Sequence, residues 1–140
     1  MKHTSFTLAL VLIFNTASAK DLPLANQMVV EYVESVMWTQ VGNGECTELI
    51  MSALFAARST KNKPKNKAKS KEVLPGDIIS FYDVEMGGLS FPQHSAIIME
   101  VESQNIFTIA HQNHNGNKTV QLLKINLKNI TQGKYSIQHP

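Results

Sequence analysis

The sequence predicts an α+β domain in which N-terminal helices pack on an antiparallel sheet of about four to six strands. Apolar residues recur at helical spacing between Leu24 and Arg58, whereas short alternating runs bounded by turn residues fill the chain after Lys71. The 140 residues contain no internal repeat. Helices that precede the strands, instead of alternating with them, indicate a single α+β unit.

Residues 1–19 have the organisation of a secretory signal peptide. A basic start at Met1–His3 precedes an apolar run from Phe6 to Phe14 and the small residues Ala17-Ser18-Ala19. The apolar run is shorter than the roughly 20 residues that a bilayer requires, so we expect no stable membrane insertion. We expect cleavage near Ala19, export to a periplasm or the exterior, and one domain over residues 20–140.

Two helices and a basic loop are predicted next. Helical spacing of apolar residues favours a first helix over Leu24–Trp38 and a second over about Glu45–Arg58. The second helix is apolar on one broad side, so we expect it to be deeply packed. Ser59–Lys71 is polar and contains Pro64, with alternating lysines from Lys61 to Lys71. We interpret it as a solvated loop in preference to a site for an anionic polymer. The net charge of +2 gives no indication of nucleic-acid binding.

The strand region begins after the turn Leu74-Pro75-Gly76-Asp77. We interpret Asp83–Pro92 as a connection between strands and Asn113–Lys118 as a turn. The expected strands, in chain order, are Ile78–Phe81, His94–Val101, Ile106–His111, Thr119–Ile125 and Lys134–Ile137.

Cys46 is the only cysteine, so it has no partner for an intrachain disulfide. It lies where the glycine-rich stretch Gly42–Gly44 gives way to the second helix. Unpaired backbone N–H groups and the positive end of the helix dipole favour a thiolate there, the form that a nucleophile needs. The alternative is an inert cysteine that serves as a small apolar residue.

Two histidines strengthen the first interpretation. His94 opens one predicted strand and His111 ends the next, and these ends lie side by side in an antiparallel hairpin. If the helix that starts near Cys46 packs on this sheet, its N-terminus reaches the same edge. The result is a thiol, a base and an orienting group, the arrangement of an activated thiol nucleophile.

Four segments of the chain carry a family resemblance: Gly42-Asn43-Gly44-Glu45-Cys46, Leu74-Pro75-Gly76-Asp77-Ile78-Ile79, Gln93-His94-Ser95-Ala96-Ile97-Ile98 and His111-Gln112-Asn113. Together they resemble the NlpC/P60 and CHAP group of papain-like cysteine peptidases and amidases. The resemblance covers roughly residues 27–125. It implies a papain-like fold of the NlpC/P60 type.

By this resemblance Cys46 is the nucleophile, His94 the general base and His111 the third, orienting residue. CHAP enzymes commonly carry Glu at the third position, whereas NlpC/P60 enzymes commonly carry His. Asn113 matches an asparagine that CHAP sites often keep. His114 is a rival for the third role, although it lies in the predicted turn.

Other polar residues have supporting roles in this interpretation. Gln93 and Gln112 are candidate hydrogen-bond donors, and Glu45 is a candidate contact for substrate amines. The alternative for Glu45 is a carboxylate that only complements the helix dipole. For Glu48 we prefer this second interpretation.

No metal or cofactor is expected, because the cysteine and the histidines lack the closely paired spacing typical of zinc ligands. The resemblance implies an exported cysteine hydrolase that cleaves amide bonds, with peptidoglycan as its substrate. The alternatives are a thiol acyltransferase or deamidase toxin that acts on protein, and a non-catalytic binding module on the same scaffold. An immunity or activating partner is not predictable from the sequence.

Overall fold

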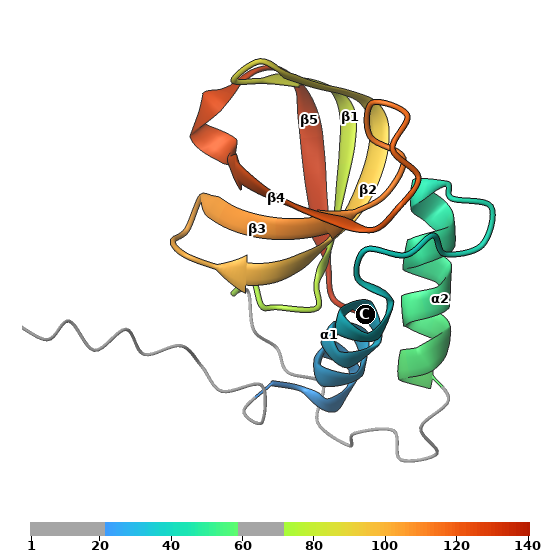
Figure 1. Cartoon of the computed structure of the whole chain (residues 1–140). Helices are drawn as coiled ribbons and strands as arrows, with labels where there is room; N and C mark the ends of the chain where they lie inside the picture. Colours follow the sequence, from blue (N-terminus) through green and yellow to red (C-terminus); the bar gives the residue numbers. More distant parts are fainter. Residues whose placement is uncertain (1–21, 59–71) are drawn as a thin grey trace, which may run out of the picture.

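The computed structural model describes residues 22–58 and 72–140, so the predicted signal peptide and the lysine-rich loop lie outside the described residues. The predicted α+β class is confirmed: two helices pack on a five-stranded antiparallel sheet (Figure 1). The elements are α1 (Leu24–Val36), α2 (Cys46–Arg58), β1 (Ile78–Met86), β2 (Leu89–Val101), β3 (Ile106–His111), β4 (Gln121–Asn126), the 3₁₀ turn η2 (Leu127–Asn129) and β5 (Ile130–Gln138).

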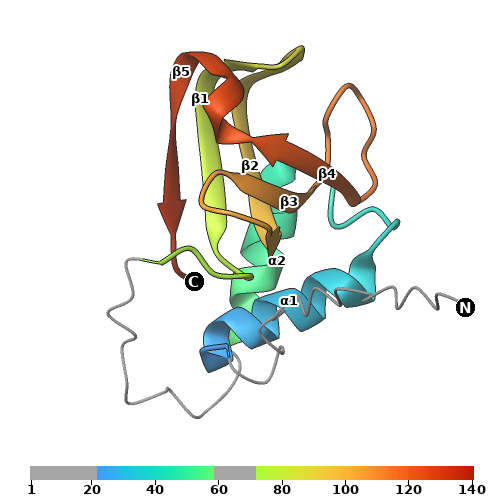
Figure 2. The same ribbon diagram turned by 90° about the vertical axis from the view of Figure 1, so that its left-hand side faces the viewer.

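The strands lie in the order β4-β3-β2-β1-β5, and each neighbouring pair is antiparallel. Consecutive hairpins therefore build four strands, and η2 turns the chain so that β5 returns beside β1. Figure 2 shows α1 below the sheet and α2 behind β2. Within the described residues, no helix is long and apolar enough to cross a membrane.

Apolar side chains form two clusters on opposite faces of the central strands. Successive residues of a strand point to opposite faces, so β2 directs Ile97 towards the helices and Ile98 into the cluster formed by the sheet itself. On the helical side, Ile97 belongs to the same buried cluster as Val33 of α1 and Leu49 of α2. These contacts fix α2 against β2, as the sequence predicted.

The expected connection over Asp83–Pro92 is wrong, because β1 and β2 form one long hairpin. Burial alternates along both strands in this region, with Val84, Met86 and Phe91 almost fully buried. Gly87 and Gly88 have φ values of 53° and 84°, the left-handed conformations that a two-residue type I′ hairpin requires. The sheet core therefore extends further along the chain than the short apolar runs indicate.

Other boundaries and one burial prediction also change. The first helix ends at Val36 instead of Trp38. The fourth strand covers Gln121–Asn126 instead of Thr119–Ile125, and the last strand covers Ile130–Gln138 instead of Lys134–Ile137. The expectation that α2 is deeply packed is wrong: only Leu49 and Ala53 are buried in it, while Met51 is 67% and Phe55 74% exposed. Among the described residues, the main contacts of this helix are with α1 and β2.

A buried carboxylate connects the helical layer to the start of the sheet. Asp77 is fully buried at the end of the predicted turn, where its backbone N–H donates to the carbonyl of Leu74 over 3.1 Å. Its carboxylate accepts hydrogen bonds from Asn26 Nδ2 at 2.8 Å, the Leu74 N–H at 2.9 Å and His139 Nδ1 at 2.7 Å. This turn therefore joins α1, β1 and the C-terminal residues.

Candidate functional site

The structure brings together the two histidines that the sequence places at one edge of the sheet. His94 Nε2 lies 2.9 Å from His111 Nδ1, and the two rings meet edge to face, with an angle of 84° between their planes. His94 lies within β2 and does not open it, because the strand begins at Leu89. The pairing of β3 with β2 ends at Ala110 opposite Ile97, so His111 follows the last pair and can meet His94.

Aromatic rings hold the His94 side chain in place. The Phe91 ring stacks on His94, with ring centroids 5.3 Å apart and planes 18° apart, and Phe81 stacks on Phe91 in turn. His94 and His111 are 6% and 4% exposed. A buried ring in a stack has little rotational freedom, so the hydrogen bond between the two imidazoles has a fixed geometry.

His114 is the third member of this ring cluster. Its ring centroid lies 5.3 Å from that of His111, 5.8 Å from that of His94 and 4.8 Å from that of Phe91. It is partly exposed, on the turn after β3. The sequence predicted the turn correctly, but it did not indicate that the turn folds back over the other two histidines. Left-handed backbone at Asn113 and Asn115 produces this return.

Burial is the main electrostatic influence on the three imidazoles. Burial, followed by the facing imidazoles of His111 and then His114, lowers the pKa of His94 from 6.5 to about 4. Burial and then His114 lower the pKa of His111 to about 4 as well, and burial lowers the pKa of His114. His94 and His111 are therefore neutral at pH 7, with one unprotonated nitrogen on each ring, and one of these two nitrogens accepts the hydrogen bond between the rings. A neutral imidazole is the form that accepts a proton.

Cys46 is the first residue of α2 and is a partly exposed free thiol. Its position is fixed from both sides along the chain. One turn further on, Leu49 is buried in one apolar cluster with Ile97 of β2 and Ala110 of β3. Directly before it, Glu45 is hydrogen-bonded to the two residues that follow His111. The start of α2 therefore lies beside the end of β3.

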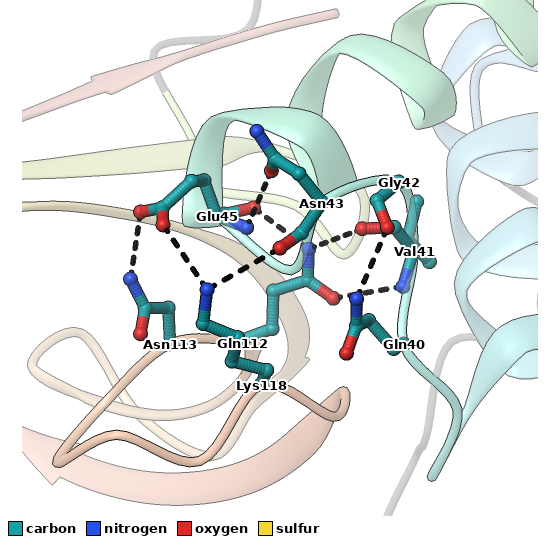
Figure 3. A network of polar contacts seen from close by, with 8 residues as sticks. All are labelled: Gln40, Val41, Gly42, Asn43, Glu45, Gln112, Asn113 and Lys118. Carbon is teal, nitrogen blue, oxygen red and sulfur yellow. Dashed lines mark hydrogen bonds and ion pairs between the residues drawn. The ribbon is translucent and has the colours of Figure 1, made fainter.

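Gln112 attaches the loop before α2 to the end of β3 (Figure 3). Its Oε1 accepts the N–H of Val41 over 3.1 Å. Its Nε2 donates to the carbonyls of Val41 and Glu45 over 2.9 and 2.7 Å. The side chain is 1% exposed and pairs with Val41 much as a neighbouring strand would. The predicted donor Gln112 thus binds backbone and positions the loop that carries Cys46.

Glu45 and Asn113 bind one another at the rim of the site (Figure 3). Asn113 Nδ2 donates to Glu45 Oε2 over 2.7 Å, and Lys118 Nζ lies 3.6 Å from Glu45 Oε1. Lys118 also reaches the carbonyl of Asn43 at 3.5 Å. The Glu45 side chain is 47% exposed, so it is held by the turn after β3 and still faces solvent. Lys118 was not among the residues predicted for the site.

The structure does not bring Gln93 into this network. Gln93 is exposed on β2 and alternates with the buried His94, so the two side chains point to opposite faces of the strand. Glu48 lies in the first turn of α2, as predicted, and its carboxylate is close to Gly42. The predicted residues therefore lie in two neighbouring groups. One is formed by the histidines, and the other by Gln112 and Asn113, which bind the loop before Cys46.

Comparison with known proteins identifies the fold family. A model of the AIM3/BBC1 cysteine proteinase-fold domain matches residues 25–138, which is most of the chain. The chain belongs to the AIM3/BBC1 cysteine proteinase-fold domain family. The match in this AIM3/BBC1 domain runs from α1 to the end of β5 and includes Cys46 and the three clustered histidines. The papain-like level of the predicted resemblance is thereby confirmed. The match names neither NlpC/P60 nor CHAP, so that finer resemblance stays a prediction.

Two solved structures share the fold of the AIM3/BBC1 domain. The crystal structure of Ly7917 has a TM-score of 0.55 and 18% sequence identity over 81% of this chain and 62% of its own. The crystal structure of Ly7917 with the hydrolyzing product of MDP has a TM-score of 0.55 and 19% identity over 82% of this chain and 63% of its own. The chain thus spans less than two thirds of the length of Ly7917. No curated protein matches the sequence.

Proposed function

We propose that this AIM3/BBC1 domain is a cysteine hydrolase that cleaves amide bonds through an acyl-enzyme. The observation that carries the proposal is the hydrogen bond between His94 Nε2 and His111 Nδ1, beside the helix start that presents the only cysteine. In an activated thiol site the base touches both the nucleophile and an orienting group. Here the second of those contacts is present, and α2 brings the thiol to the same end of the sheet.

The hydrogen bond selects one tautomer of each imidazole for this role. If the His94 Nε2–H donates to the lone pair of His111 Nδ1, then His94 Nδ1 carries a lone pair and His111 holds its proton on Nε2. His94 Nδ1 then takes the Cys46 proton as the sulfur attacks the substrate carbonyl. The lowered pKa of His94 means that this ring is neutral before the attack and accepts the proton as the attack proceeds.

The remaining steps follow the same groups. The imidazolium of His94 returns its proton to the leaving amine as the C–N bond breaks, which leaves a thioester on Cys46. A water molecule, deprotonated by His94, then cleaves the thioester and restores the thiol. The N–H groups of the first turn of α2 have no acceptor four residues earlier, so the Cys46 N–H is the proposed first donor to the oxyanion.

We propose peptidoglycan as the substrate and export as the route to it. Both rest on the signal-peptide pattern of residues 1–19 and on the predicted NlpC/P60 resemblance. Ly7917, a structure with the same fold, was crystallised with the hydrolyzing product of MDP, which supports a search for hydrolysis. Cleavage of a stem-peptide bond, or of the bond between peptide and glycan, is the reaction to test.

The test compares release of soluble fragments from cell-wall sacculi by the full chain and by three variants. Cys46→Ser should lower the rate by about 1,000-fold or more, because the covalent route is lost. His94→Ala should be nearly as harmful, whereas His111→Ala should retain more activity, since it orients the base. The control His139→Ala changes a histidine on the far Asp77 network. Equal, undiminished rates in all variants would end the hydrolase proposal.

Alkylation of Cys46 by iodoacetamide separates the alternatives if sacculi remain intact. A thiol that reacts in the folded protein, and more slowly in His94→Ala, would retain thiol chemistry and direct the search to protein deamidation or acyl transfer. A thiol that reacts only after unfolding would favour a non-catalytic binding module.

A further inference from the structure

We propose that His94, His111 and His114 form a binding site for a transition-metal ion of the Zn²⁺ type. The three imidazoles offer ligand nitrogens that all lie within 4.8 Å of one another. They come from β2, from the end of β3 and from the turn that follows it. Their sequence spacing does not favour a metal site, and only the fold brings them together.

The distances are close to those of a metal centre. Zinc binds imidazole nitrogen at about 2.0–2.1 Å, so the nitrogens of a tetrahedral site lie roughly 3.3 Å apart. His94 Nε2 and His111 Nδ1 are already 2.9 Å apart. His114 must approach them by up to about 1.5 Å for that geometry. It lies on a turn and is partly exposed, so it is the member that can move.

The ligand chemistry indicates which metals fit. Three neutral nitrogens suit zinc, copper, nickel and cobalt, whereas calcium and magnesium prefer oxygen ligands. Among the residues that the structure describes, this cluster includes no carboxylate and not the Cys46 thiol. The lowered pKa values of His94 and His111 support the site, since protons do not compete for the lone pairs at neutral pH.

Surrounding side chains restrain the proposed ligands, as outer-shell groups do in metal proteins. Phe91 contacts the rings of both His94 and His114. Gln112 anchors the chain between His111 and His114 to the loop before α2. Three ligands leave a fourth position for water, and the partly exposed His114 provides a path from solvent.

Metal binding has a consequence that rests on the proposed function. A metal on His94 Nε2 displaces the proton there, which moves to Nδ1 of the same ring, so no net proton is lost. Nδ1 then carries a hydrogen and no longer accepts the Cys46 proton. The metal-bound form is therefore an inactive form of the proposed hydrolase, and removal of the metal restores the base.

Titration of the metal-free full chain with Zn²⁺ by calorimetry, and with Co²⁺ by visible absorption, tests the site. We expect about one ion per chain and the intense visible bands of tetrahedral cobalt. Even outer-shell partners are worth 10–100-fold in metal affinity, so His114→Ala should weaken binding by about tenfold or more. His139→Ala, outside the cluster, should leave the affinity unchanged and serves as the matched control.

The binding result and the activity result are read separately. No uptake of either ion, or equal affinity in the wild type and His114→Ala, would overturn the metal site whatever the protein hydrolyses. If the chain binds the ion and His114→Ala lowers the affinity, the site is supported even if no substrate is cleaved. If hydrolysis is found, tight Zn²⁺ binding without loss of activity would overturn the proposed inactive form and leave the hydrolase proposal standing.

Discussion

Replacement of Gln112 by alanine should destabilise the domain severely, because this one side chain holds the loop that leads into α2 and Cys46. It removes three hydrogen bonds, of 3.1, 2.9 and 2.7 Å, from the Val41 N–H, the Val41 carbonyl and the Glu45 carbonyl. The carbonyls keep other donors, the N–H groups of Gly44 and Glu48. Within the part of the chain that the structure describes, the N–H of the buried Val41 has no other acceptor, so the substitution leaves it without one.

The size of the effect follows from these three losses. An orphaned buried N–H costs about 1–3 kcal/mol, and each of the other two bonds contributes about 1 kcal/mol net. The expected loss in the free energy of unfolding is therefore about 3–5 kcal/mol, a large part of the stability of a typical domain. Urea denaturation followed by circular dichroism measures it, with a fall in Tm of about 10 °C or more as a second readout.

Two variants make this prediction sharp. Gln112→Glu keeps an acceptor for the Val41 N–H but turns a carboxylate towards two carbonyl oxygens, so it should not restore the wild-type stability. The control Gln121→Ala removes a partly buried glutamine with one 3.5 Å bond and should change stability by less than about 0.5 kcal/mol. A loss below about 1 kcal/mol in Gln112→Ala would refute the anchoring role derived from the structure.

Two further predictions concern pH and backbone geometry. Since the pKa values of His94 and His111 fall from 6.5 in the unfolded chain to about 4, stability should be full above pH 6.5, decline as the pH falls towards 4, and level off below it. The free energy of unfolding changes by at most about 3 kcal/mol per imidazole. His94→Gln should therefore flatten the fall in the urea midpoint between pH 6.5 and 5, and an unchanged slope would contradict this. Gly133→Ala should cost at least about 2 kcal/mol more than Gly116→Ala. Both glycines have left-handed φ values, but only the Cβ at residue 133 would collide with the carbonyl of Asp83, so equal losses in denaturation would speak against that contact.

The resemblance and the local patterns gave a large part of the candidate site. Cys46 starts α2, and His94 and His111 meet. Both features could be predicted, because helix-start patterns and antiparallel pairing can be read from the order of residues along the chain. The long β1–β2 hairpin was missed. The sequence around Val84 mixes polar and apolar residues as a connecting loop does. Its alternating burial is seen only when the neighbouring strand is in place.

The sequence alone determined the α+β class, the helix that presents the thiol and the histidine pair, since these depend on periodicity, turn residues and chain order. Only the tertiary structure decided that His114 joins the pair, that Gln112 supports the loop before Cys46, and that one face of α2 stays exposed. Each of these depends on contacts between residues far apart in the chain, or on which surface the sheet covers. Such contacts are fixed by how the layers pack, which no local pattern encodes.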